Sequence, residues 1–99
     1  MAPSQLITVA ETEPGILLVT MRNPPVNAFT VAFSDALDEV AGRLHRSSAR
    51  AIVLGSDQKH FCAGGDISRF ESLHTRDDAM AFVTGVQGLL NRVAAIPAP

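Results

Sequence analysis

A short glycine-containing stretch constrains this chain more than any other feature. Residues 61–67 read Phe-Cys-Ala-Gly-Gly-Asp-Ile, after the apolar run 51–54 and before an amphipathic segment. Two adjacent glycines lack a Cβ, so the backbone can adopt unusual angles and approach a ligand closely. Asp66 is suited to cap a helical turn that begins at Ile67. The stretch predicts a strand-to-helix turn that presents backbone N–H groups, the donors that an oxyanion hole needs.

Turn chemistry alone leaves plainer alternatives open. Gly and Asp dominate turns for conformational reasons, so Gly64-Gly65-Asp66 also fits a simple strand-to-helix connection. A small nucleotide-binding α/β unit is another possibility. The sequence contains neither Gly-x-Gly-x-x-Gly nor a Gly-Lys-Ser/Thr phosphate loop, so this alternative ranks last.

The first part of the chain has the pattern of a β-hairpin. Residues 6–12 are rich in β-branched side chains, residues 13–15 read Glu-Pro-Gly, and the apolar pattern resumes at 16–21. Residues 16–21 are apolar on both faces, which predicts a strand covered on both sides. The apolar run 51–54 predicts a buried, central parallel strand for the same reason.

Helical spacing follows in two segments. After Thr30, which is suited to be an N-cap, four apolar residues recur on one face of a helix: Phe33, Leu37, Val40 and Leu44. A strand, helix, strand order predicts a right-handed crossover and hence an α/β fold.

The second helix is expected from a capping box at residues 75–78 to Ile96, with Pro97 ending it. Its apolar face is expected from Ala79, Val83, Val86, Leu90 and Val93, widened by Phe82 and Leu89. Gly85 and Gly88 each weaken a helix by about 1 kcal/mol relative to alanine, which indicates close packing or a mobile wall.

Composition excludes several classes of function. The net charge is −2 and Lys59 is the single lysine, so no basic surface for nucleic acid is expected. No apolar run reaches the ~18 residues that a membrane helix needs. Cys62 is the sole cysteine, which rules out an intrachain disulfide and fits a small buried thiol better than a nucleophile. The N-terminus has no secretory or transit pattern, so a cytoplasmic protein is expected.

Residues 61–67, followed by Phe70, resemble the Phe-x-Ala-Gly-x-Asp-Ile signature of the crotonase superfamily, the enoyl-CoA hydratase/isomerase family. Residues 22–29, Arg-Asn-Pro-Pro-Val-Asn-Ala-Phe, are similar to that family's first substrate loop, and 51–56 to the strand that precedes the signature. The resemblance implies the N-terminal portion of a crotonase-type ββα spiral: hairpin, helix, strand, oxyanion turn and helix. Residues 1–99 would then be an incomplete N-terminal part of one such domain, without an internal boundary.

The resemblance also implies roles for single residues. The backbone N–H of Gly65 aligns with one of two oxyanion-hole donors; many members carry alanine there, and glycine preserves a main-chain donor. Asn27 is expected to tie the first loop together, and the two prolines to leave loop carbonyls free. No metal and no cofactor are implied beyond coenzyme A as part of the substrate. Contacts with substrate are expected from Pro25, Val26, Ala28, Ala63, Gly64, Gly65, Asp66 and Ile67.

The function implied is that of an acyl-CoA thioester-processing enzyme, in which backbone N–H groups stabilise an enolate oxyanion. Hydration of a trans-2-enoyl-CoA is the commonest reaction in the family; isomerases, thioester hydrolases and dehalogenases share both motifs. The family's second donor and its glutamate acid and base lie beyond the matched part, so the 99-residue chain alone is expected to be inactive. A short relative that binds acyl-CoA or a partner without catalysis is the alternative. The full-length parent is expected to be a trimer or hexamer.

Overall fold

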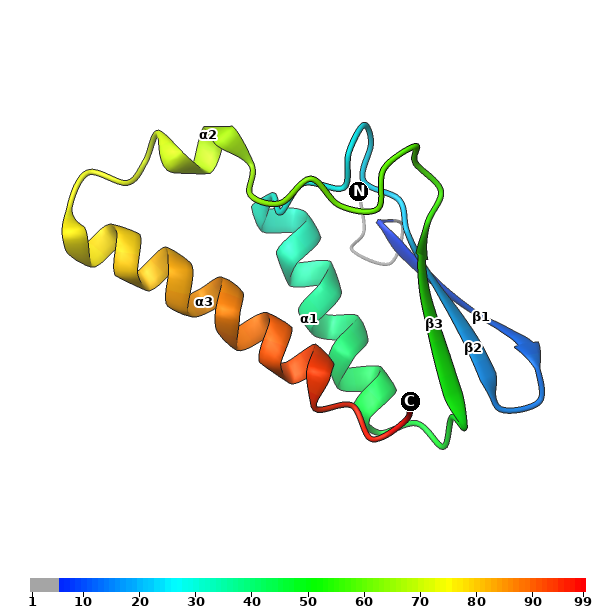
Figure 1. The fold of residues 1–99 in the computed structure, drawn as a ribbon. Helices are drawn as coiled ribbons and strands as arrows, with labels where there is room; N and C mark the ends of the chain where they lie inside the picture. The colour runs from blue at the N-terminus through cyan, green and yellow to red at the C-terminus, as the bar shows by residue number, and fades with distance from the viewer. Residues whose placement is uncertain (1–5) are drawn as a thin grey trace.

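The computed structural model describes residues 6–99, which form three strands and three helices (Figure 1). The elements in chain order are β1 (Ile7–Glu13), β2 (Ile16–Met21), α1 (Val31–His45), β3 (Ala51–Ser56), α2 (Ile67–Phe70) and α3 (Arg76–Ala94). Residues 1–5, for which the sequence predicts no leader, lie outside the described part.

The three strands form one sheet in the order β1-β2-β3. β1 pairs with β2 antiparallel, with Ile7 opposite Met21, and the turn between them contains Gly15 at a φ of 83°. β3 pairs with β2 in parallel after the α1 crossover. The predicted hairpin and the strand-helix-strand unit are therefore both confirmed.

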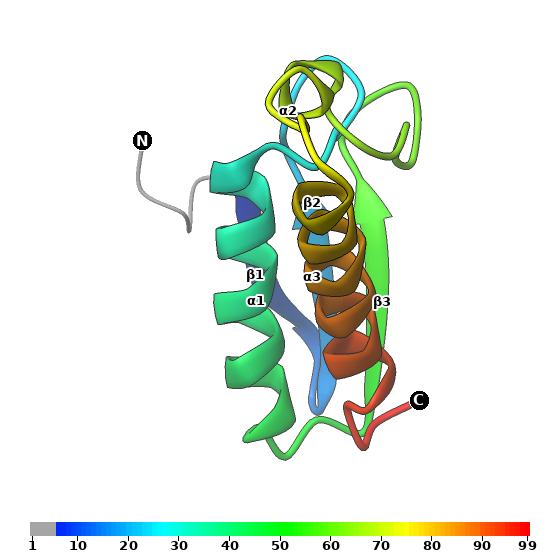
Figure 2. The ribbon, with the colours of Figure 1, turned by 90° about the vertical axis from the view of Figure 1, so that its left-hand side faces the viewer.

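Both long helices lie on the same face of the sheet (Figures 1 and 2). The apolar face of α1 is buried as its spacing predicts, and Phe33 is fully buried. Thr30 caps this helix, since its Oγ1 accepts a hydrogen bond from the Phe33 N–H at 3.1 Å. That face supplies much of the core together with side chains of the sheet and α3. The core includes Ile7, Val19, Met21, Phe33, Leu37, Val40, Leu44 and Leu89.

β3 does not have the buried, central position that its composition predicts. It is an edge strand of the sheet, and Val53 and Leu54 are 52% and 36% exposed. On its outer side the Ile52 N–H donates to the Pro99 carbonyl at 3.0 Å. The prediction of a buried central strand is wrong for the described residues. An apolar run shows that a strand favours burial, but it does not show which other elements cover that strand. Likewise the helices cover one face of β2, and Leu18 on the other face is only half-buried.

α3 begins as predicted, with Thr75 and Asp78 forming a capping box. It ends at Ala94, two residues before the predicted end at Ile96. Leu89 is the one residue of this helix that is buried among residues 6–99. The remaining large apolar side chains of its outer face, Met80, Val83 and Leu90, are about half exposed.

Candidate functional site

Two loops meet at the carboxyl end of the parallel strands. Met21 at the end of β2 is paired with Ser56 at the end of β3, so the segments 22–30 and 57–66 leave the sheet at the same edge (Figure 1). These segments carry the two motifs that the sequence singles out. The parallel pairing therefore brings both motifs together, although more than 30 residues separate them in sequence.

Backbone hydrogen bonds join the two loops directly. The Ala63 N–H donates to the Val26 carbonyl at 2.9 Å, and the Phe29 N–H donates to the Gly64 carbonyl at 2.8 Å. Phe29 and Gly65 form an isolated parallel bridge. The loops thus behave as one short ladder, so displacing either one moves the other.

The Asn27 side chain ties the same loops from within. It is fully buried, and its Nδ2 donates to Ser56 Oγ at 2.6 Å and to the Phe61 carbonyl at 2.9 Å. Its Oδ1 accepts from the Asn23 N–H at 2.8 Å. Asn27 adopts a φ of 54°, a left-handed conformation that asparagine tolerates better than most residues. The predicted structural role of Asn27 is confirmed.

Cys62 is half-buried, less than the buried thiol that is expected, and its Sγ donates to the Asn27 carbonyl at 3.1 Å. The carbonyls of Val26 and Ala28 are less free than the sequence predicts. Val26 accepts from the Ala63 N–H, and Ala28 accepts from Asn23 Nδ2 at 2.9 Å. Each proline removes a backbone N–H donor from the loop. The second loop and the Asn23 side chain supply other donors to these carbonyls.

The two glycines of the turn serve different purposes. Gly64 has a φ of 97°, which a residue with a side chain rarely adopts. Gly65 does not have a positive φ. It is required for space, because a Cβ at this position would lie 2.9 Å from Cζ of Phe70. Gly65 is exposed, and within residues 6–99 its N–H makes no hydrogen bond. It is therefore available as a donor to a ligand.

Asp66 occupies the N-cap position of α2, but its side chain makes no capping hydrogen bond. Its carboxylate accepts from the Ser68 hydroxyl instead. The predicted capping role of Asp66 is wrong, because a nearby hydroxyl competes with the backbone N–H groups of a helix that has a single turn.

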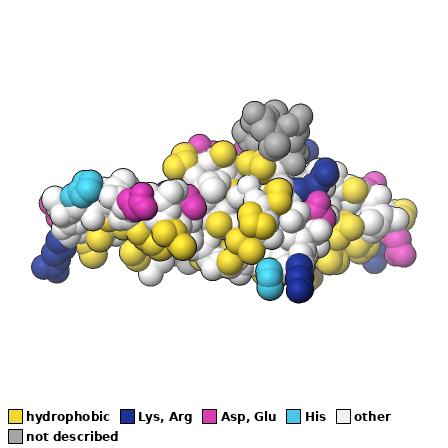
Figure 3. All heavy atoms as spheres, turned by 90° about the horizontal axis from the view of Figure 1, so that it is seen from above, with side chains coloured by type: hydrophobic (Ala, Val, Ile, Leu, Met, Phe, Trp, Pro, Cys, Tyr) yellow, Lys and Arg dark blue, Asp and Glu magenta, His cyan; other side chains and the backbone are white. Residues whose placement is uncertain are grey.

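The other residues expected to contact substrate lie around this turn. Pro25, Ala63 and Ile67 are exposed, and Ile67 most of all at 75%. Val26, Ala28, Gly64 and Asp66 are half-buried. Viewed onto this end, hydrophobic side chains are exposed among scattered charged groups (Figure 3). Exposed apolar side chains near the turn include Val31, Phe61, Ile67 and Phe70.

Arg69 is the residue of this region that sequence reasoning misses. Its Nη1 donates to the Phe29 carbonyl at 2.9 Å and to Ser34 Oγ at 3.2 Å. Its guanidinium also lies over the Phe82 ring, 4.7 Å from the centroid. Both hydrogen-bond partners are distant in sequence, so no local pattern could have indicated them.

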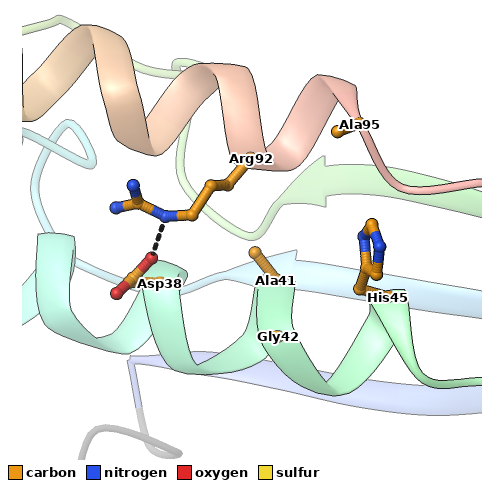
Figure 4. Close-up of a pocket in the computed structure, with 6 residues that line it drawn as sticks. All are labelled: Asp38, Ala41, Gly42, His45, Arg92 and Ala95. Carbon is orange, nitrogen blue, oxygen red and sulfur yellow. Dashed lines mark hydrogen bonds and ion pairs between the residues drawn. The ribbon is translucent and has the colours of Figure 1, made fainter.

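A groove lies between α1 and α3 (Figure 4). It is lined by Asp38, Ala41, Gly42, His45, Arg92 and Ala95. Arg92 Nε and Asp38 Oδ1 are 2.7 Å apart across it, and both side chains are more than half exposed. An exposed ion pair of this kind contributes about 0–1 kcal/mol to stability. Neither sequence motif reaches this groove.

No cluster of three or more His, Cys, Asp or Glu side chains suited to a metal ion occurs within residues 6–99. None of the helices in that range has the length and apolarity to cross a membrane.

A family model for enoyl-CoA hydratase/isomerase matches residues 11–99, which includes both loops and every helix and strand except the start of β1. The chain belongs to the enoyl-CoA hydratase/isomerase family. The resemblance noted from the two motifs is thereby confirmed.

Relatives from several organisms support this membership. The crystal structure of an enoyl-CoA hydratase from Mycobacterium smegmatis superimposes with a TM-score of 0.83 at 30% identity, over 95% of this chain and 37% of that one. A mitochondrial enoyl-CoA hydratase domain-containing protein 2 from Homo sapiens is 32% identical over 98 residues, covering 96% of this chain and 33% of its own length.

A third relative has a different name. The (7aS)-7a-methyl-1,5-dioxo-2,3,5,6,7,7a-hexahydro-1H-indene-carboxyl-CoA hydrolase of Mycobacterium tuberculosis is 39% identical over 66 residues, covering 66% of this chain and 27% of its own length. The chain spans well under half the length of each of these family members. The predicted α/β fold of the crotonase type, a hairpin followed by a helix, is confirmed by the matches to solved family structures.

Proposed function

We propose that the protein acts on acyl-CoA thioesters and that the Gly65 N–H donates a hydrogen bond to the thioester oxygen. One observation carries the proposal. In a chain of the enoyl-CoA hydratase/isomerase family, the amide at the signature position is exposed and makes no hydrogen bond within residues 6–99. A backbone N–H that is fixed in a turn and has no acceptor within the chain can donate a hydrogen bond to an anionic oxygen of a substrate.

The reaction proposed for the full-length protein is hydration of a trans-2-enoyl-CoA. A glutamate base takes one proton from a water molecule as the water oxygen forms a bond to the β carbon. The π pair between the α and β carbons becomes the second bond between the α carbon and the carbonyl carbon, and the π pair of the carbonyl moves to the thioester oxygen. The resulting enolate takes a proton at the α carbon, which restores the carbonyl. Charge on the oxygen is largest in the enolate, so a fixed N–H donor lowers the barrier more than it strengthens substrate binding.

The remaining parts of the proposal concern binding and context. Coenzyme A would lie along the joined loops, over Pro25, Val26 and Ala28 on one side and Ala63, Gly64, Asp66 and Ile67 on the other. Proton transfer is assigned to glutamates outside residues 1–99. The full-length protein would be a cytoplasmic trimer or hexamer that uses no cofactor besides the coenzyme A of its substrate.

A proline substitution tests the donor, because proline has no backbone N–H. We expect Gly65→Pro to slow hydration by about 100-fold to 1,000-fold, the usual cost of one oxyanion donor. Binding is measured by calorimetry with an acyl-CoA and with its thioether analogue, in which a methylene replaces the carbonyl. The wild type should prefer the thioester, and Gly65→Pro should lose that preference.

Gly65→Ala is the matched control, since it keeps the N–H. Its Cβ would meet the Phe70 ring, so the pair Gly65→Ala with Phe70→Leu provides the relaxed form of that control. A wild type that binds both ligands equally, or a Gly65→Pro variant as active as the control, overturns the proposal. A wild type that prefers the thioester without hydrating it identifies the non-catalytic acyl-CoA-binding alternative instead.

A further inference from the structure

Arg69 connects three separate elements to the signature turn. It lies in α2, four residues after Gly65, and is half-buried. Its Nη1 donates to the Phe29 carbonyl in the first loop and to the Ser34 hydroxyl in α1. The same guanidinium lies over the Phe82 ring of α3. A planar, permanently charged group with several donors is well suited to hold such a junction.

Both backbone groups of Phe29 are hydrogen-bonded to the segment that contains the signature turn. The N–H of Phe29 donates to the Gly64 carbonyl at 2.8 Å, and the carbonyl of Phe29 accepts from Arg69 at 2.9 Å. The segment from Gly64 to Arg69 is thus closed onto one residue of the neighbouring loop. The Gly65 amide lies inside this closed segment, so the two hydrogen bonds together limit how its peptide plane can rotate.

A second contact supports Gly65 through its Cα. The Phe70 ring occupies the space that a Cβ of Gly65 would take, with Cζ 2.9 Å from that position. Phe70 in turn packs edge-on against Phe82, with ring centroids 5.5 Å apart and planes at 72°. Arg69 and Phe70 therefore both contact the Phe82 ring, and this ring connects α3 to the turn.

We propose that Arg69 is a positioning residue that fixes the direction of the Gly65 N–H through the backbone of Phe29, whose carbonyl accepts from Arg69 and whose N–H donates to the Gly64 carbonyl. This inference rests on the proposed role of Gly65 as an oxyanion donor. The strength of a hydrogen bond falls steeply with misalignment, so a donor that is free to rotate loses most of its advantage for the developing charge. Arg69 thus acts on the thioester carbonyl and leaves the contacts with the rest of coenzyme A unchanged.

The test is Arg69→Met, which keeps an unbranched side chain of similar length and removes the donors and the charge. We expect the preference for thioester over thioether to fall about tenfold, the effect of one hydrogen bond, with kcat falling in parallel. Affinity for free coenzyme A should change less than about twofold. The stretching frequency of a ¹³C-labelled thioester carbonyl, lowered on binding to the wild type, should be lowered less in the variant.

Three further variants separate positioning from stability. Arg69→Lys keeps the charge but has no planar fork, so its thioester preference should lie between those of the wild type and Arg69→Met. Ser34→Ala removes the longer of the two hydrogen bonds and should behave as wild type. Arg92→Met is the matched control, since it removes an arginine of α3 that pairs with Asp38 away from the turn.

The outcomes distinguish the two proposals. A wild type without thioester preference overturns the role of Gly65, and the role of Arg69 with it. A wild type with that preference, retained in Arg69→Met, overturns the role of Arg69 alone. If Arg69→Met does not fold, Arg69→Lys decides: a wild-type preference at an unchanged urea midpoint overturns the inference, and a reduced preference at that midpoint supports it.

Discussion

At the scale of single residues, Asn27 determines whether the two loops stay joined. It combines a left-handed backbone with three side-chain hydrogen bonds in a fully buried position. Asn27→Ala should lower the free energy of unfolding by about 3 kcal/mol, because it leaves part-buried partners unsatisfied and places alanine at a positive φ that asparagine tolerates better. Urea denaturation measures the change.

Asn27→Gly is the control that separates these two causes, because glycine removes the same hydrogen bonds without strain at positive φ. It should recover about 1 kcal/mol relative to Asn27→Ala. If Asn27→Gly were as stable as the wild type, the hydrogen bonds would contribute nothing and the tie between the loops would need another explanation.

Residue roles that depend on local chemistry could be predicted from the sequence, and those that depend on distant partners could not. The turn glycines and the Asn27 tie follow from known backbone preferences. Arg69 donates to residues 40 and 35 positions away, which no local pattern encodes. Asp66 was mispredicted for a third reason, since Ser68 competes for its carboxylate.

At the scale of elements, α3 carries a glycine that its packing does not explain. A Cβ at Gly85 would have no atom within 4 Å, so close packing does not account for it among the described residues. Gly85→Ala should therefore raise the free energy of unfolding by about 0.5–1 kcal/mol through helix propensity. Thermal unfolding checks this.

Gly15→Ala serves as the contrasting substitution. Gly15 has a φ of 83°, and an added Cβ would lie 2.8 Å from Cδ of Arg50, so alanine there should destabilise. A Gly85→Ala variant that loses stability as Gly15→Ala does would show that something packs against α3 at that point.

The positions of elements were predicted well and their surroundings less so. Periodicity and caps located α1 and α3 within about two residues because these signals are local. The edge position of β3 was missed, since strand composition does not state how many strands follow. The parallel pairing of β2 with β3, which brings the site together, followed from the chirality and order of the crossover.

At the scale of the whole molecule, two elements away from the signature turn also expose apolar surface. Val53 and Leu54 are exposed on the edge strand β3, and Met80, Val83 and Leu90 on the outer face of α3. An unpaired strand edge beside exposed apolar side chains favours association. The matching family members from Mycobacterium smegmatis and Homo sapiens are chains more than twice as long as residues 1–99.

We therefore predict that the 99-residue chain, prepared alone, self-associates. Sedimentation velocity over a range of concentrations should show a sedimentation coefficient that rises with concentration. Leu90→Lys should shift the population toward monomer, because it places a charge in the apolar face of α3. Ser48→Lys, at an exposed polar position in the loop between α1 and β3, adds the same charge away from that face and should leave the association unchanged. A sharp monomeric boundary at all concentrations, with cooperative unfolding, would contradict the prediction and show that these surfaces need no cover.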